Sequence, residues 1–428
     1  AVPRLRRDRF LPAVLAPLAQ GACVFFGTLL ALALSTNAAG QTNDALVLLH
    51  ANVIDGLGGE PLLDRAVVVR DGKIVDIVAS TAAPGGATVH DLKGKYLLPG
   101  LIDSHVHVGS PAQAKKALFS GITTVRSMGV SYYADVGLRE LAKKKVIDAP
   151  EVLAAGYHVR PHPTEDLFLQ EPSLSDLFSV VSGAESYRLV TAANLERGVD
   201  WIKITSTERA GLPDTDPRKQ TMTREEIAAV VDEATKRGVP VASHAHGDEG
   251  GRAAVLAGVR SIEHGTYLSE ETLRLMKERG TFLVPTLAVV ADLMAPGGDY
   301  DDPILQVRGR HMMPRILEVV RTARKLGVPI VAATDTGFGA SSTLTLQHEI
   351  EMLTRCGLSP MEAIQAATKV PAELLGIAER TGSIQKGLEA DLIAVDRNPL
   401  EDVLSLQDVL LVVNNGKVVL DRVSFGLE

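Results

Sequence analysis

The sequence predicts an α/β protein: a (β/α)8 TIM barrel with a small β-sandwich domain built from both chain ends. Three observations favour this fold class. The chain has 428 residues, which is enough for a barrel of about 250 residues and a smaller satellite. Residues 98–384 alternate short apolar strands with helical stretches, whereas both ends are rich in strands. We therefore expect the composite β-sandwich over residues 43–97 and 385–428, and the barrel between them.

Each end of the chain contains apolar strands that are joined by tight turns. Near the N-terminus, residues 66–69 and 74–78 flank the turn Asp71-Gly72-Lys73, after a first strand at residues 47–49. Near the C-terminus, residues 409–413 and 418–420 flank a turn at 414–417, after a strand at 391–395. Such pairs of strands around a glycine-containing turn are typical of β-hairpins. Two strand-rich ends around a different middle indicate one β-domain to which both ends contribute.

Eight short apolar segments are the predicted barrel strands. Helical stretches such as residues 224–237 and 308–326 lie between several of them. The segments are residues 100–102, 123–125, 152–154, 201–204, 239–242, 261–262, 282–284 and 330–333. A doubly wound sheet is the competing layout, but the glycine signature that binds phosphate is missing after the first strand.

The first 42 residues predict an export signal. Four arginines at positions 4–9 precede an apolar run over residues 11–34, and small residues follow at 35–39. This order is typical of a secretory signal peptide, so we expect an exported bacterial protein, periplasmic or secreted. An uncleaved membrane anchor and a retained assembly helix are the alternatives, since the run is long enough to span a bilayer.

Composition argues against a nucleic-acid partner and against an intramolecular disulfide bond. The net charge is -8 and aromatic residues make up 4% of the chain, which argues against a nucleic-acid partner. Of the two cysteines, Cys23 lies in the signal-like segment and Cys356 stands alone in the rest. We therefore expect no intramolecular disulfide after cleavage.

Residues of the types that can bind metal ions lie at the ends of several predicted strands. In a barrel, the carboxyl ends of the strands meet on one face, where active sites form. Residues at i and i+2 of a strand point to the same side, so two imidazoles spaced in this way can grip one ion. The residues in question are His105 and His107 after the first strand, His244 and His246 after the fifth, His264 after the sixth and Asp335 after the eighth.

Lys203 lies inside the apolar fourth strand. A buried ammonium without a partner is costly and tends to lose its proton. The neutral amine can then react with carbon dioxide to form a carbamate, which behaves as a carboxylate between two cations. Alternatively, the side chain reaches the barrel mouth or pairs with an acid.

Five stretches resemble the amidohydrolase superfamily: residues 98–107, 242–247, 261–265, 332–336 and 386–392. The resemblance covers nearly all of residues 45–428. Lys203 points to the binuclear branch with a carbamylated lysine. Within it the chain is similar to the Xaa-Pro dipeptidase and carboxypeptidase-like group, which includes bacterial enzymes that hydrolyse ochratoxin A. Where many relatives have a glycine-rich segment after the lysine, this chain has Thr205-Ser206-Thr207-Glu208.

The resemblance implies two divalent metal ions, with zinc the expected metal. His105, His107 and Asp335 would hold the first ion, and His244 and His264 the second. Carbamylated Lys203 would bridge them, together with a hydroxide that attacks the substrate. Asp335 would accept the proton of the attacking water. His246 would bind the substrate carbonyl, or else orient a metal ligand.

A substrate with a free carboxylate needs cationic or hydrogen-bonding anchors near the metals. The candidates are His158, Arg160 and His162 after the third strand, Tyr267 after the sixth, and Ser110 after the first.

The expected reaction is hydrolysis of an amide or peptide bond beside a C-terminal apolar or aromatic amino acid. Ochratoxin A, which would give phenylalanine and ochratoxin alpha, has this layout; the natural substrate would be an N-acyl amino acid or a dipeptide. By resemblance we expect a homo-oligomer, of which an octamer is one form. The alternatives are a cyclic-amide hydrolase, a lactonase or phosphotriesterase, a deaminase, and a non-catalytic scaffold.

Overall fold

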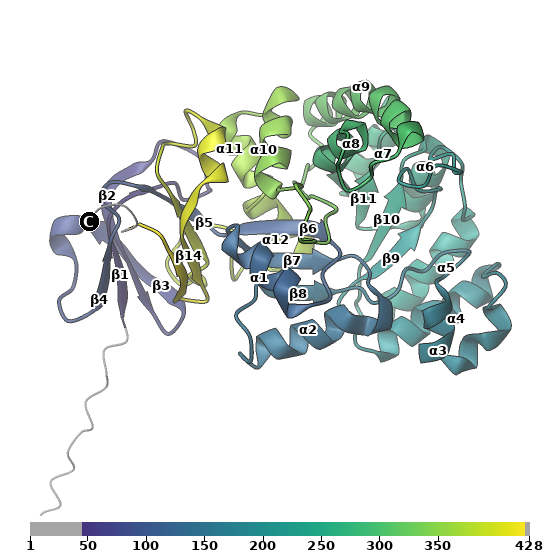
Figure 1. Ribbon diagram of the computed structural model, residues 1–428, viewed down its shortest axis with the longest axis horizontal. Coiled ribbons are helices and arrows are strands. Elements are labelled where there is room, and N and C mark those ends of the chain that lie inside the picture. Colours follow the sequence, from purple (N-terminus) through teal and green to yellow (C-terminus); the bar gives the residue numbers. More distant parts are fainter. Residues whose placement is uncertain (1–44, 424–428) are drawn as a thin grey trace, which may run out of the picture. The chain divides into compact units, whose positions relative to one another are not determined.

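The structure is a computed structural model that describes residues 45–423. The expected export signal, residues 1–42, lies outside the described residues. The described part has the predicted α/β architecture, a parallel barrel and a sheet formed from both chain ends (Figure 1). Among the described residues, no helix combines the length and apolar character needed to cross a membrane.

One eight-stranded sheet makes up the small domain. Its strands follow the order β15-β14-β13-β5-β1-β2-β3, and β4 pairs with β1. The two chain ends meet where β5 pairs antiparallel with β13, with Leu97 opposite Ala394; in Figure 1 the purple and yellow strands lie side by side here. The N-terminal strands are β1 (Leu46–Val53), β2 (Leu62–Arg70), β3 (Lys73–Ala79), β4 (Thr88–Asp91) and β5 (Tyr96–Pro99); the C-terminal ones are β13 (Leu392–Val395), β14 (Val409–Asn414) and β15 (Lys417–Asp421).

Alternating side chains of both halves of this sheet form one apolar core. Leu48, Val67 and Ile74 from the N-terminal strands are buried with Leu392 and Leu411 from the C-terminal strands. Because strand side chains alternate between faces, these residues lie on one face of the sheet. The strands of the predicted sandwich thus form one continuous sheet with this core on one face.

Seven parallel strands form most of the barrel wall. β6, β7 and β8 make one sheet, and β9, β10, β11 and β12 make another. An isolated bridge between Val159 and Ile204 links the two sheets. The strands are β6 (Leu101–Val106), β7 (Ile122–Ser127), β8 (Glu151–Ala154), β9 (Ile202–Thr205), β10 (Val241–Ala245), β11 (Ser261–His264) and β12 (Phe282–Val284).

The eighth position of the barrel is filled by residues 330–336, which form only single bridges. Ile330 pairs with Leu283 of β12, and Thr336 pairs with Val106 of β6, so the barrel closes. Between these bridges Asp335 has a φ of 60°, which a regular strand does not permit. The predicted strand at 330–333 is thus an irregular segment held at both ends.

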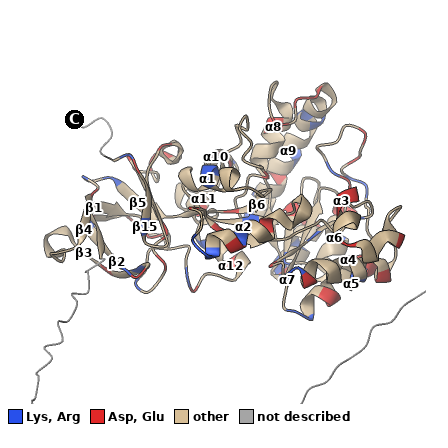
Figure 2. Cartoon of the chain, turned by 60° about the horizontal axis from the view of Figure 1, so that its bottom comes forward, with Lys and Arg blue, Asp and Glu red and all other residues tan. Residues whose placement is uncertain are grey.

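Helices surround the barrel and bury their apolar faces against it. Several end at a glycine with positive φ, such as Gly327 after α9, because glycine adopts this conformation without strain. The helices are α1 (Pro111–Phe119), α2 (Ala134–Lys143), α3 (Glu165–Gln170), α4 (Ala184–Glu196), α5 (Arg224–Thr235), α6 (Asp248–Ala257), α7 (Glu270–Arg279), α8 (Leu287–Met294), α9 (Pro303–Leu326), α10 (Leu346–Arg355), α11 (Pro360–Gln365) and α12 (Lys369–Leu375). Figure 2 shows that the outer helices carry both acidic and basic residues.

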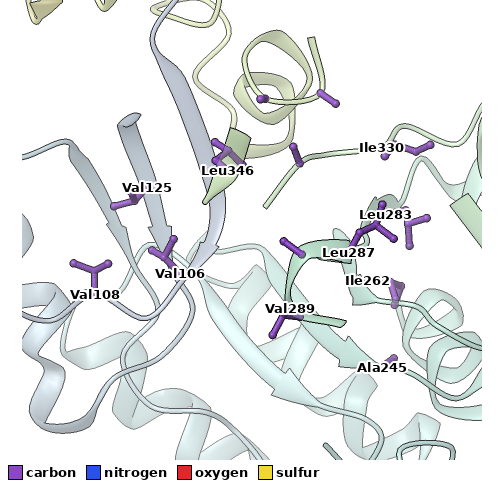
Figure 3. Close-up of a cluster of buried hydrophobic side chains, with 14 of the residues drawn as sticks. Val106, Val108, Val125, Ala245, Ile262, Leu283, Leu287, Val289, Ile330 and Leu346 are labelled. Atoms are coloured by element: carbon purple, nitrogen blue, oxygen red, sulfur yellow. The ribbon is translucent and has the colours of Figure 1, made fainter. Parts of the chain in front are cut away.

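The main apolar core lies between the strands and these helices. Val106, Val125 and Ile262 from the strands pack into one cluster with Leu287 of α8 and Leu346 of α10 (Figure 3). This packing fixes the carboxyl ends of the strands, where the polar residues described next are located.

Candidate functional site

A cluster of histidines, one lysine and one aspartate lies at the carboxyl ends of the barrel strands. The strands themselves carry His105, Lys203, His244 and His264. His107 and His246 directly follow strands, and Asp335 directly precedes the bridge at Thr336. All seven line a single cavity. The structure thus brings together the residues that the sequence singled out.

Asp335 is at the centre of the first half of the cluster. Its Oδ1 atom lies 3.0 Å from Nε2 of His107 and 3.4 Å from Nε2 of His105, and its Oδ2 atom lies 4.0 Å from Nε2 of His264. Nζ of Lys203 lies 3.2 Å from Nε2 of His105. One carboxylate, three imidazoles and an amine therefore converge on one small volume.

The second half of the cluster consists of three imidazoles. The ring of His264 lies 4.6 Å, centroid to centroid, from those of His244 and His246. Ligand atoms of these three histidines lie within 4.8 Å of one another, and so do those of the set His105, His264 and Asp335. His264 belongs to both sets, which is the arrangement expected of two neighbouring cation sites.

Most of the rings are oriented by hydrogen bonds on their outward side. Nδ1 of His105 contacts Glu263, that of His107 contacts the carbonyl of Gly129, and that of His264 contacts the hydroxyl of Thr286. Such contacts fix the tautomer and leave the other nitrogen free to bind a cation. His246 repeats the pattern, with Nδ1 2.9 Å from the hydroxyl of Thr266.

Three residues at the barrel mouth adopt backbone conformations that non-glycine residues rarely have. The φ angles are 69° for His264, 60° for Asp335 and 50° for Thr286. Left-handed backbone at such residues costs free energy and persists where the surroundings impose it, frequently at functional sites. Two of these residues belong to the cluster, and the third, Thr286, carries the hydroxyl that orients His264.

Burial disfavours the protonated forms of buried basic groups in the cluster. It lowers the pKa of Lys203 to about 8 and the pKa of His246 to about 3. For Asp335, burial favours the neutral acid, but the surrounding histidines, His105 foremost, hold its pKa well below its usual range. At neutral pH the imidazole of His246 is therefore neutral and Asp335 is a carboxylate, the forms that bind divalent cations, whereas Lys203 loses its proton more readily than an exposed lysine does.

A buried ion pair under the cluster was not apparent from the sequence. Arg126 and Glu263 are both fully buried, and the guanidinium of Arg126 donates to both carboxylate oxygens. Arg126 also lies over the ring of Trp201, 4.5 Å from its centroid. The only sign in the sequence is that each charge interrupts an apolar strand.

Two arginines without a carboxylate partner border the cavity. His107, His158 and Arg209 line both the histidine cavity and an adjoining cavity of about 200 Å³, which Arg160 also lines. Neither arginine forms an ion pair within residues 45–423, and the buried Nε of Arg160 has no hydrogen-bond partner there. Burial lowers the pKa of Arg160, and the positive charge of Arg209 lowers it further. Sequence analysis missed Arg209, because it lies in a loop without periodicity.

Three predicted substrate contacts do not reach these cavities. Ser110 caps α1 and bonds to Gln113. His162 is exposed. Tyr267 lines a separate surface groove next to His311. Of the five candidates, the structure places only His158 and Arg160 beside the histidine cluster.

Part of the cavity lining is apolar. Val289, Val290 and Leu293 of α8 line it together with Tyr300, which follows the helix. The site therefore combines a cluster of candidate cation ligands, two arginines and an apolar surface.

Comparison with known proteins agrees with this geometry. Residues 96–419 match the model of the amidohydrolase family. Ochratoxinase of Aspergillus niger is 29% identical over 419 residues, which cover 86% of this chain and 85% of that protein. Its crystal structure shares 26% identity and a TM-score of 0.74, covering 88% of this chain and 96% of that one. The structure of a Xaa-Pro dipeptidase with bound methionine in its active site shares 29% identity and a TM-score of 0.77, covering 87% and 99%.

Proposed function

The chain belongs to the amidohydrolase family as a hydrolase of amide bonds, and we propose that it cleaves the bond next to a C-terminal apolar or aromatic amino acid. The observation that carries this proposal is the pair of arginines without carboxylate partners, Arg160 and Arg209, beside the histidine cluster. Guanidinium groups bind carboxylates through paired, charge-assisted hydrogen bonds.

The donor set fits two divalent cations. We propose that His105, His107 and Asp335 hold one ion and that His244 and His264 hold the other. Lys203 would contribute as a carbamate, since the residue is only 1% exposed and its pKa, lowered to about 8, leaves a larger fraction of the reactive neutral amine than an exposed lysine has. Imidazole and carboxylate ligands suit zinc. When bound, a pair of such ions supplies Lewis acidity and lowers the pKa of water.

The residues around the ions have separable tasks in this proposal. Asp335 stays ionised at neutral pH and can accept a proton from the attacking water, then pass it to the leaving amine. Nε2 of His246 faces the cavity as a neutral donor or acceptor, because its Nδ1 contacts Thr266. We place it at the substrate carbonyl; a third ligand to the second ion is the alternative.

The proposed substrate class follows from the two arginines and the apolar surface that line the cavities. Arg160 and Arg209 would hold the α-carboxylate, and the apolar surface of α8 would contact an apolar or aromatic part of the substrate. Ochratoxin A, an amide of phenylalanine, satisfies both requirements, and a relative that shares 29% of the sequence is named ochratoxinase. N-acyl amino acids and dipeptides satisfy them as well.

The test compares matched substrates with purified protein of known metal content. Ochratoxin A and N-acetylphenylalanyl-phenylalanine should release phenylalanine, whereas the same dipeptide with a C-terminal amide should react at least about tenfold more slowly, because it lacks the charge. Arg209→Ala should remove most of this preference. Equal rates on acid and amide would refute the carboxylate anchor. If a protein with two metals per chain cleaves neither, the substrate class is wrong, and lactones and phosphotriesters should be tried.

A further inference from the structure

The loop between β9 and α5 contacts both halves of the candidate site. Its residues Arg209, Ala210 and Gly211 line the histidine cavity. Its Glu208 carbonyl lies 3.2 Å from Nε2 of His244, which orients that ring. The position of this loop therefore determines where the guanidinium of Arg209 lies.

A single arginine from a distant helix binds this loop. Nη1 of Arg308 on α9 donates to the carbonyls of Ala210 at 2.6 Å and Leu212 at 2.5 Å. Its Nη2 donates to the carbonyls of Pro213 at 3.2 Å and Thr215 at 2.5 Å. Four carbonyls of one irregular loop thus converge on one guanidinium, whose planar fork holds several acceptors at once.

The same loop packs closely against the segment that precedes α9. A Cβ atom added at Gly211 would come within 2.7 Å of the Tyr300 ring, and Tyr300 itself lines the cavity. Within residues 45–423, Arg308 forms no ion pair that would compete for its donors. The loop is therefore held from the α9 side by one cation and one close ring contact.

We propose that Arg308 is a positioning residue, which holds residues 209–215 in place so that Arg209 reaches the carboxylate of the substrate. This inference rests on the proposed function, since it assigns Arg209 that task. The other end of the loop has its own anchor: the Glu208 side chain accepts from the amide of Asp216 at 2.8 Å and from Lys219 at 2.6 Å. Loss of Arg308 should consequently release Arg209 and leave the contact between Glu208 and His244 in place.

The test uses Arg308→Met in the metal-loaded full chain. This change keeps the aliphatic length and removes every donor. Hydrogen exchange of the Thr215 amide, which bonds to Leu212 in the same loop, should become faster. KM for N-acetylphenylalanyl-phenylalanine should rise roughly tenfold or more, as for a lost charge-assisted contact, while kcat and metal content change little. Arg310→Met is the matched control, because Arg310 is exposed on the same helix and should leave all four readouts unchanged.

A double-substitution cycle separates positioning from a general structural effect. In an Arg209→Ala background, Arg308→Met should raise KM by less than about twofold, because the group that it positions is already gone. Additive effects would overturn the inference, as would unchanged exchange at Thr215. If Arg308→Met does not fold, Arg308→Lys, which keeps the charge but not the fork, should show the same pattern.

A failure of the proposed function can be distinguished from a failure of this inference. If the wild-type protein cleaves no amide with a free carboxylate, the function is refuted, whereas the exchange data still decide whether Arg308 holds the loop.

Discussion

Nδ1 of His105 lies 2.8 Å from Oε2 of Glu263, and both side chains are buried in the histidine cluster. Glu263 in turn receives two hydrogen bonds from Arg126. Burial alone would favour the neutral acid, but Arg126 and His105 lower the pKa of Glu263 to about 2. An anionic Glu263 fixes the Nδ1-H tautomer of His105 and raises the basicity of its Nε2, which faces Asp335 and Lys203.

We therefore expect Glu263→Gln to weaken metal binding by roughly 10- to 100-fold, the usual effect of losing the partner of a ligating histidine. The amide cannot accept from both His105 and Arg126 as an anion does. Titration with a chelator, followed by metal analysis, measures the change. Glu271→Gln, which alters an exposed acid paired with Arg252, is the control. Retention of both metals at the wild-type chelator concentration would show that His105 does not need this anion.

The second prediction concerns Lys203. A carbamate carries a negative charge and can bind a cation, whereas an ammonium cannot. We expect Lys203→Ala to lose metal and activity, and short carboxylates such as acetate to restore part of both by filling the vacated space. Lys203→Arg should not respond, because its guanidinium blocks that space and does not form a carbamate. Metal content and amide hydrolysis with and without acetate are the measurements. An alanine variant that binds two metals without acetate would contradict a bridging role.

Asp335 gives a third prediction. Asp335→Asn removes the proton acceptor and should lower kcat by about 10²- to 10⁴-fold, the range for loss of a general base. Because Asp335 also contacts His105 and His107, metal content must be determined in the same preparation. The exposed Asp301→Asn variant should behave as wild type. If Asp335→Asn retains both metals and near-normal turnover, another group accepts the proton.

Apolar runs in the sequence located seven strands of the barrel and the hairpins of the small sheet, but not β4 and β5 of that sheet, nor the conformation of the segment that carries Asp335. That segment was predicted as a regular strand over residues 330–333. In the structure it is held instead by Asp103, which accepts from the backbone and the hydroxyl of Thr334. The positive φ of Asp335 then turns its carboxylate into the cluster. A contact between residues 231 positions apart leaves no periodic signal in either segment.

The cluster itself could be predicted because its residue types and strand-end positions are both informative. Its surroundings could not, since they depend on side-chain direction in loops. His162 follows the same strand as Arg160 but is exposed, and Arg209 reaches the cavity through a loop that Arg308 holds across 98 positions. The pairing of Arg126 with Glu263 likewise joins two strands that are 137 residues apart.

The last prediction concerns Glu349 of α10, a fully buried acid against the start of α8. Its Oε2 accepts from the amide of Ala288 at 2.7 Å, and its Oε1 has no partner among the described residues. Burial raises the pKa of this carboxyl from 4.5 to about 8. Between these two values the folded protein holds a proton that the unfolded chain has released. The contribution of Glu349 to the free energy of unfolding is therefore full below pH 4.5, and it is lost as the pH rises toward 8.

Glu349→Gln should abolish this part of the pH dependence, because the amide still accepts from Ala288 but does not ionise. The difference in melting temperature, wild type minus variant, should become more negative from pH 5 to pH 8. Taking the difference cancels the titration of the histidine cluster, which both proteins share. Glu351→Gln on the same helix, where Glu351 pairs with Arg355, should give a flat difference. A flat difference for Glu349→Gln as well would mean that Glu349 ionises in the folded state much as it does in the unfolded chain.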